Sequence, residues 1–377
     1  MPPTSPLPLL SLASGYGSYP TPAVAAEAAI ATIRSTRALP VSEAEGKPEL
    51  RAALAAHYQR RGAAHVTADY VVVTPGGKAG LLTLLQAVLQ PGDEVLVPTP
   101  AWFGFWEVIQ RAGGVTRMLP LSPDDNYALT PAQLAVALTP RTRLLLLTNP
   151  NNPTGRLYTR AEVAALLEVT RQHPELLVLS DEIYDLVRFG DEPTPTLLSF
   201  PDPHAQHLVL NGFSKSLMLV GWGVGYLVVP PALARRCAAI QFATGKSVPA
   251  PAQAAAQAAV EAADTITADL LAQLAPNRAL LLHALAELPN VPALSPPAGT
   301  YYAFPDLRAY LPLLAKSPEV ASATLVGHLR TEGIEVVDGT GCGTPGFVRL
   351  SYAVEPDVLA AALPRLQAAL KLIGNAH

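Results

Sequence analysis

The sequence is poor in cysteine, in aromatic residues and in charge. Two of its 377 residues are cysteine, 6% are aromatic and 15% are charged. Cys237 and Cys342 lie far apart and outside any CxxC pair, so we expect two free thiols in a reducing cytoplasm. The net charge is −4, with no basic run, which argues against a protein that binds nucleic acid through its phosphates.

The chain also lacks the long apolar runs of a membrane protein. No stretch reaches the roughly 18 uninterrupted apolar residues of a membrane-spanning helix. The first residues, MPPTSPLPLLSLASG, contain no basic group and several prolines, so they do not resemble a secretory signal peptide. Half of the residues are hydrophobic, which is enough for a large core, and the length suggests two domains or one large domain with a smaller lobe.

Short β-rich runs alternate with helical periodicity between about residues 46 and 230. The predicted strands are Tyr70–Val73, Glu94–Val97, Arg143–Leu147, Leu176–Leu179, Leu208–Leu210 and Gly225–Val229. The predicted helices include Gly80–Leu89, Phe103–Arg111, Thr159–Gln172 and one that starts at the Thr130-Pro131 pair. This alternation indicates an α/β domain with a mostly parallel sheet flanked by helices.

The chain changes character after residue 230. Residues 250–287 are alanine-rich and predicted to be helical, with one interruption near Pro276. Short predicted strands and two helices follow, the last at about 355–372. They indicate a smaller α+β lobe, which the first residues, with one short helix at about 22–35, would complete. We therefore expect a large domain at 40–275 and a small domain formed by 1–39 and 276–377.

Several short motifs do not meet the requirements of the sites that they suggest. Gly339–Gly343 has the glycines of a dinucleotide-binding loop, but a predicted strand follows it instead of a helix. Gly76-Gly77-Lys78 lacks the spacing and the trailing Ser or Thr of a Walker A loop, and Gly212–Ser216 lacks one glycine of a nucleophile elbow. His204 and His207 have no cysteine nearby, so a metal site has little support.

Polar residues follow four of the predicted strands. Tyr70–Val73 leads into Thr74–Lys78, and three later strands end in Thr148–Gly155, Ser180–Tyr184 and Asn211–Lys215. Ligands of open α/β sheets bind beyond the carboxyl ends of the strands, so we expect one site there. Glycines before a helix suit a phosphate. Lys215, alone among the six lysines, directly follows an apolar strand, where desolvation would lower its pKa and make the amine nucleophilic.

Taken together, these segments resemble the pyridoxal-phosphate (PLP)-dependent aminotransferases of class I/II, which have the aspartate aminotransferase fold, fold type I. Asn152, Asp181, Lys215 and Arg349 follow the family's order, with spacings of 29, 34 and 134 residues. The resemblance covers nearly the whole chain and includes Gly15…Thr21-Pro22, Gly46…Leu50-Arg51, Gly299–Tyr302 and Arg349–Tyr352. It implies transfer of an amino group from an amino acid to a 2-oxo acid, in a homodimer with active sites at the subunit interface.

The resemblance also implies a role for each site residue. Lys215 would form the internal aldimine with pyridoxal 5′-phosphate and then move the proton between Cα and C4′. Asp181 would pair with the pyridine nitrogen, and Arg349 would bind the substrate carboxylate. The remaining implied contacts are Gly76, Gly77, Lys78 and Ser214 at the cofactor phosphate, Trp102 on the ring face, Asn152 and the catalytic Tyr184 at the ring hydroxyl, and Gly15 and Asn152 at the substrate.

Three positions depart from the family pattern, all of them at the implied phosphate site. Gly223 stands where an arginine normally binds the phosphate, Gly212 stands where many members have serine, and Val41 replaces a tyrosine that reaches the neighbouring subunit's phosphate. Because an anionic phosphate without a cation is costly to desolvate, we expect Lys78 to compensate. Ser214 or Ser216 and the helix start behind Gly76 would contribute as well.

The resemblance leaves the reaction and the substrate partly open. The same frame supports C–S β-lysis and related eliminations, and a PLP-binding regulatory protein with little turnover is a further alternative. Lys215, Asp181, Asn152, Tyr184 and Arg349 are present together, which favours aminotransfer. We find no second arginine placed to bind a side-chain carboxylate, which favours a neutral or aromatic amino acid. We expect small-molecule partners, without nucleic acid, membrane or metal.

Overall fold

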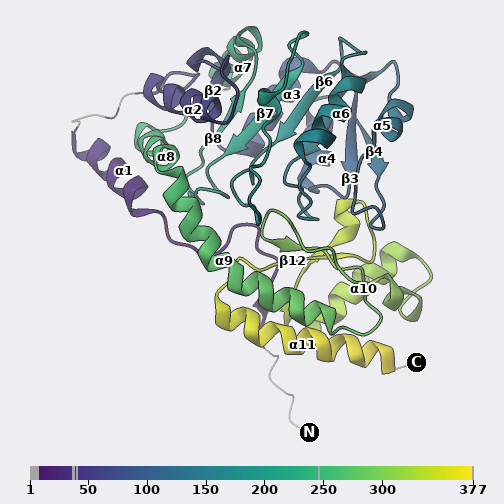
Figure 1. The fold of residues 1–377 in the computed structure, drawn as a ribbon. Coiled ribbons are helices and arrows are strands. Elements are labelled where there is room, and N and C mark those ends of the chain that lie inside the picture. Colours follow the sequence, from purple (N-terminus) through teal and green to yellow (C-terminus); the bar gives the residue numbers. More distant parts are fainter. Residues whose placement is uncertain (1–7, 36–38, 40, 245–246, 376–377) are drawn as a thin grey trace.

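The structure is a computed structural model that describes residues 8–35, 39, 41–244 and 247–375. Its centre is one seven-stranded sheet with helices on both faces, and a smaller group of short strands and helices lies below it (Figure 1). The order across the sheet is β2 (Val71–Thr74), β8 (Gly225–Val228), β7 (His207–Gly212), β6 (Leu177–Asp181), β5 (Thr142–Thr148), β3 (Glu94–Thr99) and β4 (Val115–Pro120).

The sheet is mostly parallel, as predicted. Only β8 runs antiparallel to its two neighbours, β2 and β7. All the other pairs, from β7 across to β4, are parallel. The carboxyl ends of these strands therefore meet at one edge, where a parallel α/β sheet places its ligands.

Each central strand is buried on both faces because its apolar residues are continuous rather than alternating. In β5, Leu144 and Leu146 pack in one hydrophobic cluster, while Leu145 and Leu147 pack in the other, since successive side chains of a strand point to opposite faces. The first cluster includes residues of α3 (Gly77–Val88), α4 (Gly104–Arg111) and α7 (Pro231–Ala243). The second includes residues of α2 (Pro48–Arg60), α6 (Arg160–Thr170) and α8 (Ala250–Glu261).

The predicted helix start at Thr130 is confirmed in α5 (Pro131–Ala137). Thr130 accepts a hydrogen bond from the backbone N–H of Gln133 (3.2 Å), and the Gln133 side chain accepts one from the Thr130 N–H (2.9 Å). This reciprocal pair satisfies two N–H groups that a helix start leaves without partners. Sequence patterns did not predict strand β4, because it lies at the sheet edge with half-exposed apolar residues such as Val115 and Met118.

The smaller group of elements joins both ends of the chain. Its strand β1 (Leu10–Ser11) pairs in parallel with β10 (Ile334–Glu335). Beside it, β12 (Val348–Ser351) pairs with β11 (Val337–Asp338) and β9 (Tyr302–Ala303). Helices α10 (Pro318–Thr331) and α11 (Pro356–Asn375) cover these strands (Figure 1). An early segment thus reaches the strands that carry Arg349.

The predicted interruption near Pro276 is wrong. Helix α9 (Ala263–Ala286) continues through Pro276, and the break from α8 lies at Ala262 instead. A proline removes one backbone hydrogen bond, but the helix is anchored on both sides of it. Leu274 is buried, and the Asn277 side chain donates to the carbonyls of Tyr352 (3.1 Å) and Val354 (2.8 Å). These tertiary contacts outweigh the local propensity.

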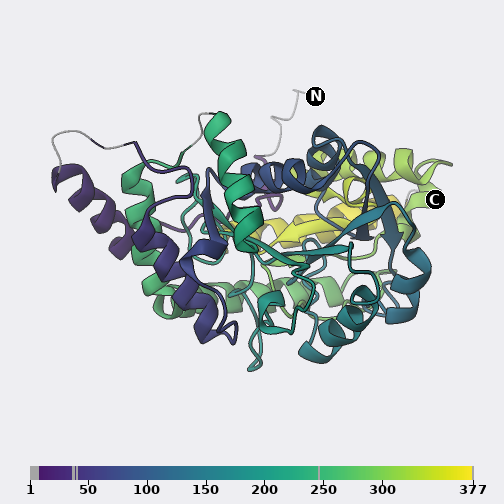
Figure 2. The same cartoon turned by 90° about the horizontal axis from the view of Figure 1, so that it is seen from above.

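Helix α1 (Ala23–Ser35) lies at one edge of the molecule, packed along α8 (Figures 1 and 2). Its outer face carries exposed Ile30 and Ile33. In the described part of the chain, no helix has the length and apolar character needed to cross a membrane.

We expect Gly225→Ala to destabilise the fold, because β8 passes very close to the turn between β2 and α3. A Cβ on Gly225 would lie 2.5 Å from the Gly77 nitrogen and 2.6 Å from the Gly76 carbonyl carbon, and neither backbone atom can rotate away. Such overpacking costs about 1–3 kcal/mol. Urea unfolding monitored by circular dichroism would measure it.

Gly327→Ala is the matched control for this substitution. Gly327 is an exposed residue inside α10, and nothing lies within 4 Å of an added Cβ. Alanine there should raise the free energy of unfolding by about 0.5–1 kcal/mol, because it favours the helix. Equal effects of the two substitutions would contradict the close approach at Gly225.

Candidate active site

The polar residues that follow β2, β5, β6 and β7 line one cavity of about 620 Å³ at the carboxyl edge of the sheet. This volume lies within the range of small-molecule sites. The cavity wall includes every site residue expected from the sequence, namely Gly15, Gly76, Gly77, Lys78, Trp102, Asn152, Asp181, Tyr184, Ser214, Lys215 and Arg349. Segments more than 300 residues apart in sequence therefore meet there.

Lys215 lies in the loop after β7, and its side chain is partly buried. Its amine donates a hydrogen bond to the carbonyl of Gly15 (2.5 Å) and lies 3.6 Å from the centre of the Tyr16 ring. Burial, followed by the positive charge of Arg349, lowers the pKa of Lys215 to about 7, although Asp181 acts in the opposite direction. A substantial fraction of the amine is therefore neutral, and so nucleophilic, near pH 7.

Asp181 is the last residue of β6 and is buried. Its carboxylate accepts a hydrogen bond from the backbone N–H of Ile183 (3.2 Å). Burial raises the pKa of Asp181 to about 7, and the Ile183 N–H and the Lys215 charge only partly offset this effect. The buried carboxylate has too few hydrogen bonds and nearby positive charges to offset its loss of hydration. A cationic N–H partner, such as a protonated pyridine nitrogen, would stabilise it.

Three donors meet at the carbonyl of Gly15. Besides Lys215, the hydroxyls of Tyr301 (2.8 Å) and Tyr302 (3.2 Å) donate to it. The Tyr302 hydroxyl also lies 2.7 Å from that of Tyr184. Tyr16, Tyr301 and Tyr302 had no predicted role, because no motif spacing connects them to Lys215. Together they fix the N-terminal segment against the lysine.

Arg349 is buried on β12 and has no acidic partner among the described residues. Its guanidinium donates to the Asn152 side chain (3.2 Å) and to the Ala13 carbonyl (3.0 Å), and it stacks 4.2 Å from the centre of the Tyr302 ring. Its Nε has no partner. Burying an arginine without a counter-charge costs free energy. A carboxylate that binds to the guanidinium would supply this counter-charge.

Another part of the cavity wall is formed by glycines and the start of α3. Gly76, with φ +86°, precedes the helix, and Gly221 and Gly223 also have positive φ with open space around an added Cβ. Lys78 lies at the mouth, 59% exposed, with its amine 3.6 Å from the Glu107 carboxylate. The backbone N–H groups at the start of α3 have no helical partners, and such groups at a helix start can bind a phosphate.

The two candidate serines are placed differently. Ser214 lines the cavity, whereas Ser216 is buried and donates to the Ile183 carbonyl (3.2 Å). Val41 is 92% exposed and is not among the lining residues. Trp102 lines the cavity beside α4, with its ring perpendicular to Phe105 at 5.2 Å. Of the two serines, Ser214 alone can contribute to the phosphate end from this position.

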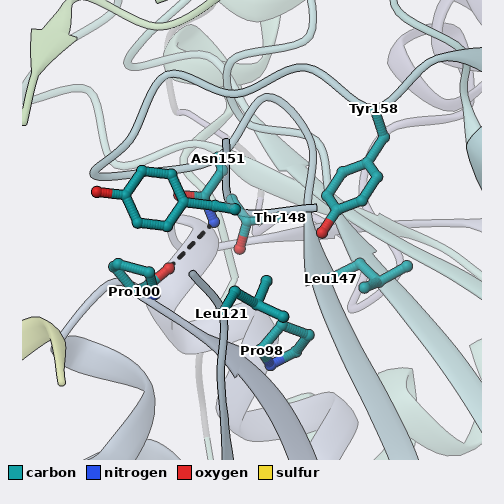
Figure 3. A pocket seen from close by; sticks show the side chains of 8 residues that line it. Pro98, Pro100, Leu121, Leu147, Thr148, Asn151 and Tyr158 are labelled. Carbon is teal, nitrogen blue, oxygen red and sulfur yellow. Dashed lines mark hydrogen bonds between the residues drawn. The ribbon is translucent and has the colours of Figure 1, made fainter. Parts of the chain in front are cut away.

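A second, much smaller cavity lies next to the loop that carries Asn152 (Figure 3). Its volume is about 10 Å³, which is room for about one water molecule. Asn151 donates to the Pro100 carbonyl (3.3 Å), and its side-chain oxygen accepts from the Thr154 N–H (3.2 Å). These contacts fix the loop and so position Asn152 in the main cavity.

Comparison with known proteins decides the family. The model for aminotransferase class I and II matches residues 8–366. The chain belongs to this family. Aspartate aminotransferase of Streptomyces avermitilis is 34% identical over 98% of this chain and 90% of its own length. The aspartate/prephenate aminotransferase of Cereibacter sphaeroides is 32% identical, over 96% and 90%.

The solved structures agree with this assignment. Aspartate aminotransferase of Thermus thermophilus with maleate superposes with a TM-score of 0.87 at 32% identity, over 96% of this chain and 92% of that chain. The chain is thus a PLP-dependent aminotransferase of fold type I. The lyase and regulatory alternatives are not favoured. The residues fit the cofactor, since Lys215 has a lowered pKa, the buried carboxyl of Asp181 has a raised pKa, and glycines lead into the start of α3.

Two substitutions should shift the pKa of Lys215 in opposite directions. Asp181→Asn removes a negative charge that stabilises the ammonium, so the pKa should fall below about 7. Arg349→Met removes a positive charge that destabilises it, so the pKa should rise. The pH dependence of Lys215 acetylation in the apoprotein, followed by mass spectrometry, measures both. Lys371 on α11 provides the internal control, and shifts of the same sign would contradict this electrostatic account.

Proposed function

We propose that this aminotransferase moves the amino group of an α-amino acid to a 2-oxo acid, with Lys215 as the residue that binds the cofactor and transfers the proton. The observation that carries this proposal is the partly buried amine of Lys215, which lines the same cavity as buried Asp181 and as buried Arg349, whose guanidinium has no acidic partner among the described residues. A base with a pKa of about 7 is well matched to proton transfer near neutral pH.

Each charged group has a separate task in this proposal. Arg349 binds the substrate carboxylate in a bidentate manner, with the Tyr302 ring behind its guanidinium. The Lys215 amine would move the proton from the substrate Cα to C4′ in the first half of the reaction, and from C4′ to the Cα of the new amino acid in the second half. Asp181 holds the proton of the ring nitrogen. Pyridoxal phosphate, when bound, supplies an electron sink for the electron pair at Cα.

The remaining assignments concern orientation. Asn152 and Tyr184 would hydrogen-bond the ring oxygen, Trp102 would stack on the ring and Gly15 would contact the substrate. All four line the same cavity as Lys215, which supports these roles. Burial raises the pKa of Tyr184 well above its usual range, so its hydroxyl stays protonated and can donate.

At the phosphate end, the assigned groups are the start of α3 at Gly76 and Gly77, the Ser214 hydroxyl and the Lys78 amine. Support comes from their positions in the cavity wall and from the lack of a side chain at Gly223. Lys78 is the only cation that lines this end in the described part of the chain. It carries the charge that an arginine would otherwise provide.

We also propose that the protein is a homodimer, that it is cytoplasmic and that it consists of two domains. Exposed apolar side chains at Ile30, Ile33, Val41 and Phe242 support a homodimer that covers them. The two buried, unpaired cysteines are consistent with a reducing cytoplasm. A large domain at 40–275 and a small domain at 1–39 and 276–377 is consistent with the central sheet, whose strands all fall within residues 71–228.

A half-reaction tests the function. An amino acid alone should convert the bound aldehyde cofactor into its amine form, and a 2-oxo acid should restore the original spectrum. Lys215→Ala should slow the conversion at least about 100-fold, because it removes the proton-transferring group, whereas Lys316→Ala, an exposed control, should not. Release of ammonia or thiol without an acceptor would show a lyase, and no spectral response to any amino acid would contradict turnover.

Lys78→Ala should weaken the binding of pyridoxal 5′-phosphate about fivefold, because a partly exposed ion pair contributes roughly 1 kcal/mol. Fluorescence titration of the apoprotein would measure the dissociation constant. Pyridoxal, which lacks the phosphate, should bind the variant and the parent protein equally. Unchanged affinity for the phosphorylated cofactor would remove Lys78 from the phosphate site.

A further inference from the structure

A glycine-rich turn connects β11 to β12, the strand that carries Arg349. The turn begins with the segment Gly339–Gly343, which leads into a strand and so does not form a dinucleotide-binding loop. The two strands are antiparallel, and Val337 on β11 is the direct partner of Arg349. The glycine-rich segment therefore lies at the tip of a hairpin, and the strands of this hairpin place Arg349 in the cavity wall.

Trp106 binds this tip from outside the cavity. Its indole Nε1–H donates a hydrogen bond to the Gly341 carbonyl (2.8 Å). Trp106 belongs to α4, which begins two residues after Trp102, and it is not among the described residues that line the cavity. The hydrogen bond therefore joins the hairpin that carries Arg349 to the segment that carries Trp102, the residue proposed to stack on the cofactor ring.

Backbone contacts hold the same tip beside Trp102. The N–H of Ala101, the residue before Trp102, donates to the Cys342 carbonyl (3.1 Å). A Cβ on Gly343 would lie 3.3 Å from the Thr99 Cβ at the end of β3, so the two backbones approach closely. These contacts cannot be removed without changing the backbone. The Trp106 hydrogen bond comes from a side chain, so a substitution can remove it alone.

The other side of the hairpin is bound to α10. The Ser322 hydroxyl donates to the Asp338 carboxylate (2.7 Å) and accepts a hydrogen bond from the Gly346 N–H (2.9 Å). The hairpin is thus held between α10 and the segment that carries Trp102. A carboxylate bound to Arg349 must lie at a fixed distance from the cofactor ring, because small displacements of a reactant lower the rate strongly.

We propose that Trp106 is a positioning residue of the substrate site, and that its N–H holds the hairpin tip so that Arg349 keeps its place relative to the cofactor ring. This inference rests on the proposed binding of the substrate carboxylate by Arg349. A guanidinium binds a carboxylate through two parallel hydrogen bonds, which depend on orientation. Loss of the Trp106 hydrogen bond therefore weakens carboxylate binding, although Trp106 touches neither substrate nor cofactor.

The first experiment measures the binding of two unreactive carboxylates, maleate and 3-phenylpropionate, to the cofactor-loaded protein. The absorbance of the cofactor reports both dissociation constants. Trp106→Phe, which removes the N–H and keeps an aromatic ring, should raise both by the same factor of about five, the scale of one net hydrogen bond. The affinity of the apoprotein for pyridoxal 5′-phosphate should not change. Unchanged carboxylate affinity, or an equal loss of cofactor affinity, would overturn the proposal.

Gln59→Met is the matched control. It also removes one side-chain N–H from a backbone carbonyl, that of Val66 (2.7 Å). Gln59 lies on α2, which packs on the other face of the sheet from α4, so its substitution should leave all three dissociation constants unchanged. A weakening of carboxylate binding equal to that of Trp106→Phe would show a general loss of structure and overturn the specific role of Trp106.

A double-mutant cycle tests whether Trp106 acts through Arg349. Arg349→Met should weaken both carboxylates at least about 30-fold. Trp106→Phe should then add little, because the group that it positions is absent, and a further loss of about fivefold would overturn the positioning role. Arg349→Met without effect would contradict the proposed function at Arg349 and this inference with it. A non-additive cycle in a protein without amino-acid turnover would contradict the proposed function while supporting this inference.

Discussion

The amine of Lys215 donates a hydrogen bond to the carbonyl of Gly15, and this contact joins the central sheet to the N-terminal segment. Two tyrosine hydroxyls, from Tyr301 and Tyr302, donate to the same carbonyl. A single backbone oxygen therefore connects three parts of the chain that are far apart in sequence. These hydrogen bonds hold the N-terminal segment against the Lys215 amine, which is partly buried.

The same burial acts on both titratable groups at the centre of the site, with opposite consequences. It lowers the pKa of Lys215 and raises that of Asp181, each to about 7, since burial disfavours the charged form of any group. Without a cofactor, the two groups compensate each other only in part. A ligand with a cationic ring nitrogen would supply the counter-charge that the carboxylate of Asp181 lacks.

The polar segments that follow the predicted strands indicated which residues would lie together in this cavity, because the topology of a parallel sheet determines where the strands end. Parallel strands bring their carboxyl ends to one edge, so Asn152, Asp181 and Lys215 could be placed together from strand positions alone. Arg349 and Gly15 came only from the family resemblance. Tyr16 and Tyr302 were missed because their proximity to Lys215 depends on how the small strands pack beneath the sheet. The unbroken helix at Pro276 was missed because the buried contacts of Leu274 and Asn277 are also long-range.

The cavity wall contains few cations, both where the cofactor phosphate is proposed to bind and where the substrate is proposed to bind. Gly223 leaves open space where a basic side chain could project, and the amine of Lys78 lies 3.6 Å from the carboxylate of Glu107. A cation already engaged by one anion gains less from a second, because the pair it must leave offsets the pair it forms. Among the described cations of the cavity wall, Arg349 therefore has no ion pair to leave when an anion binds, whereas Lys78 does.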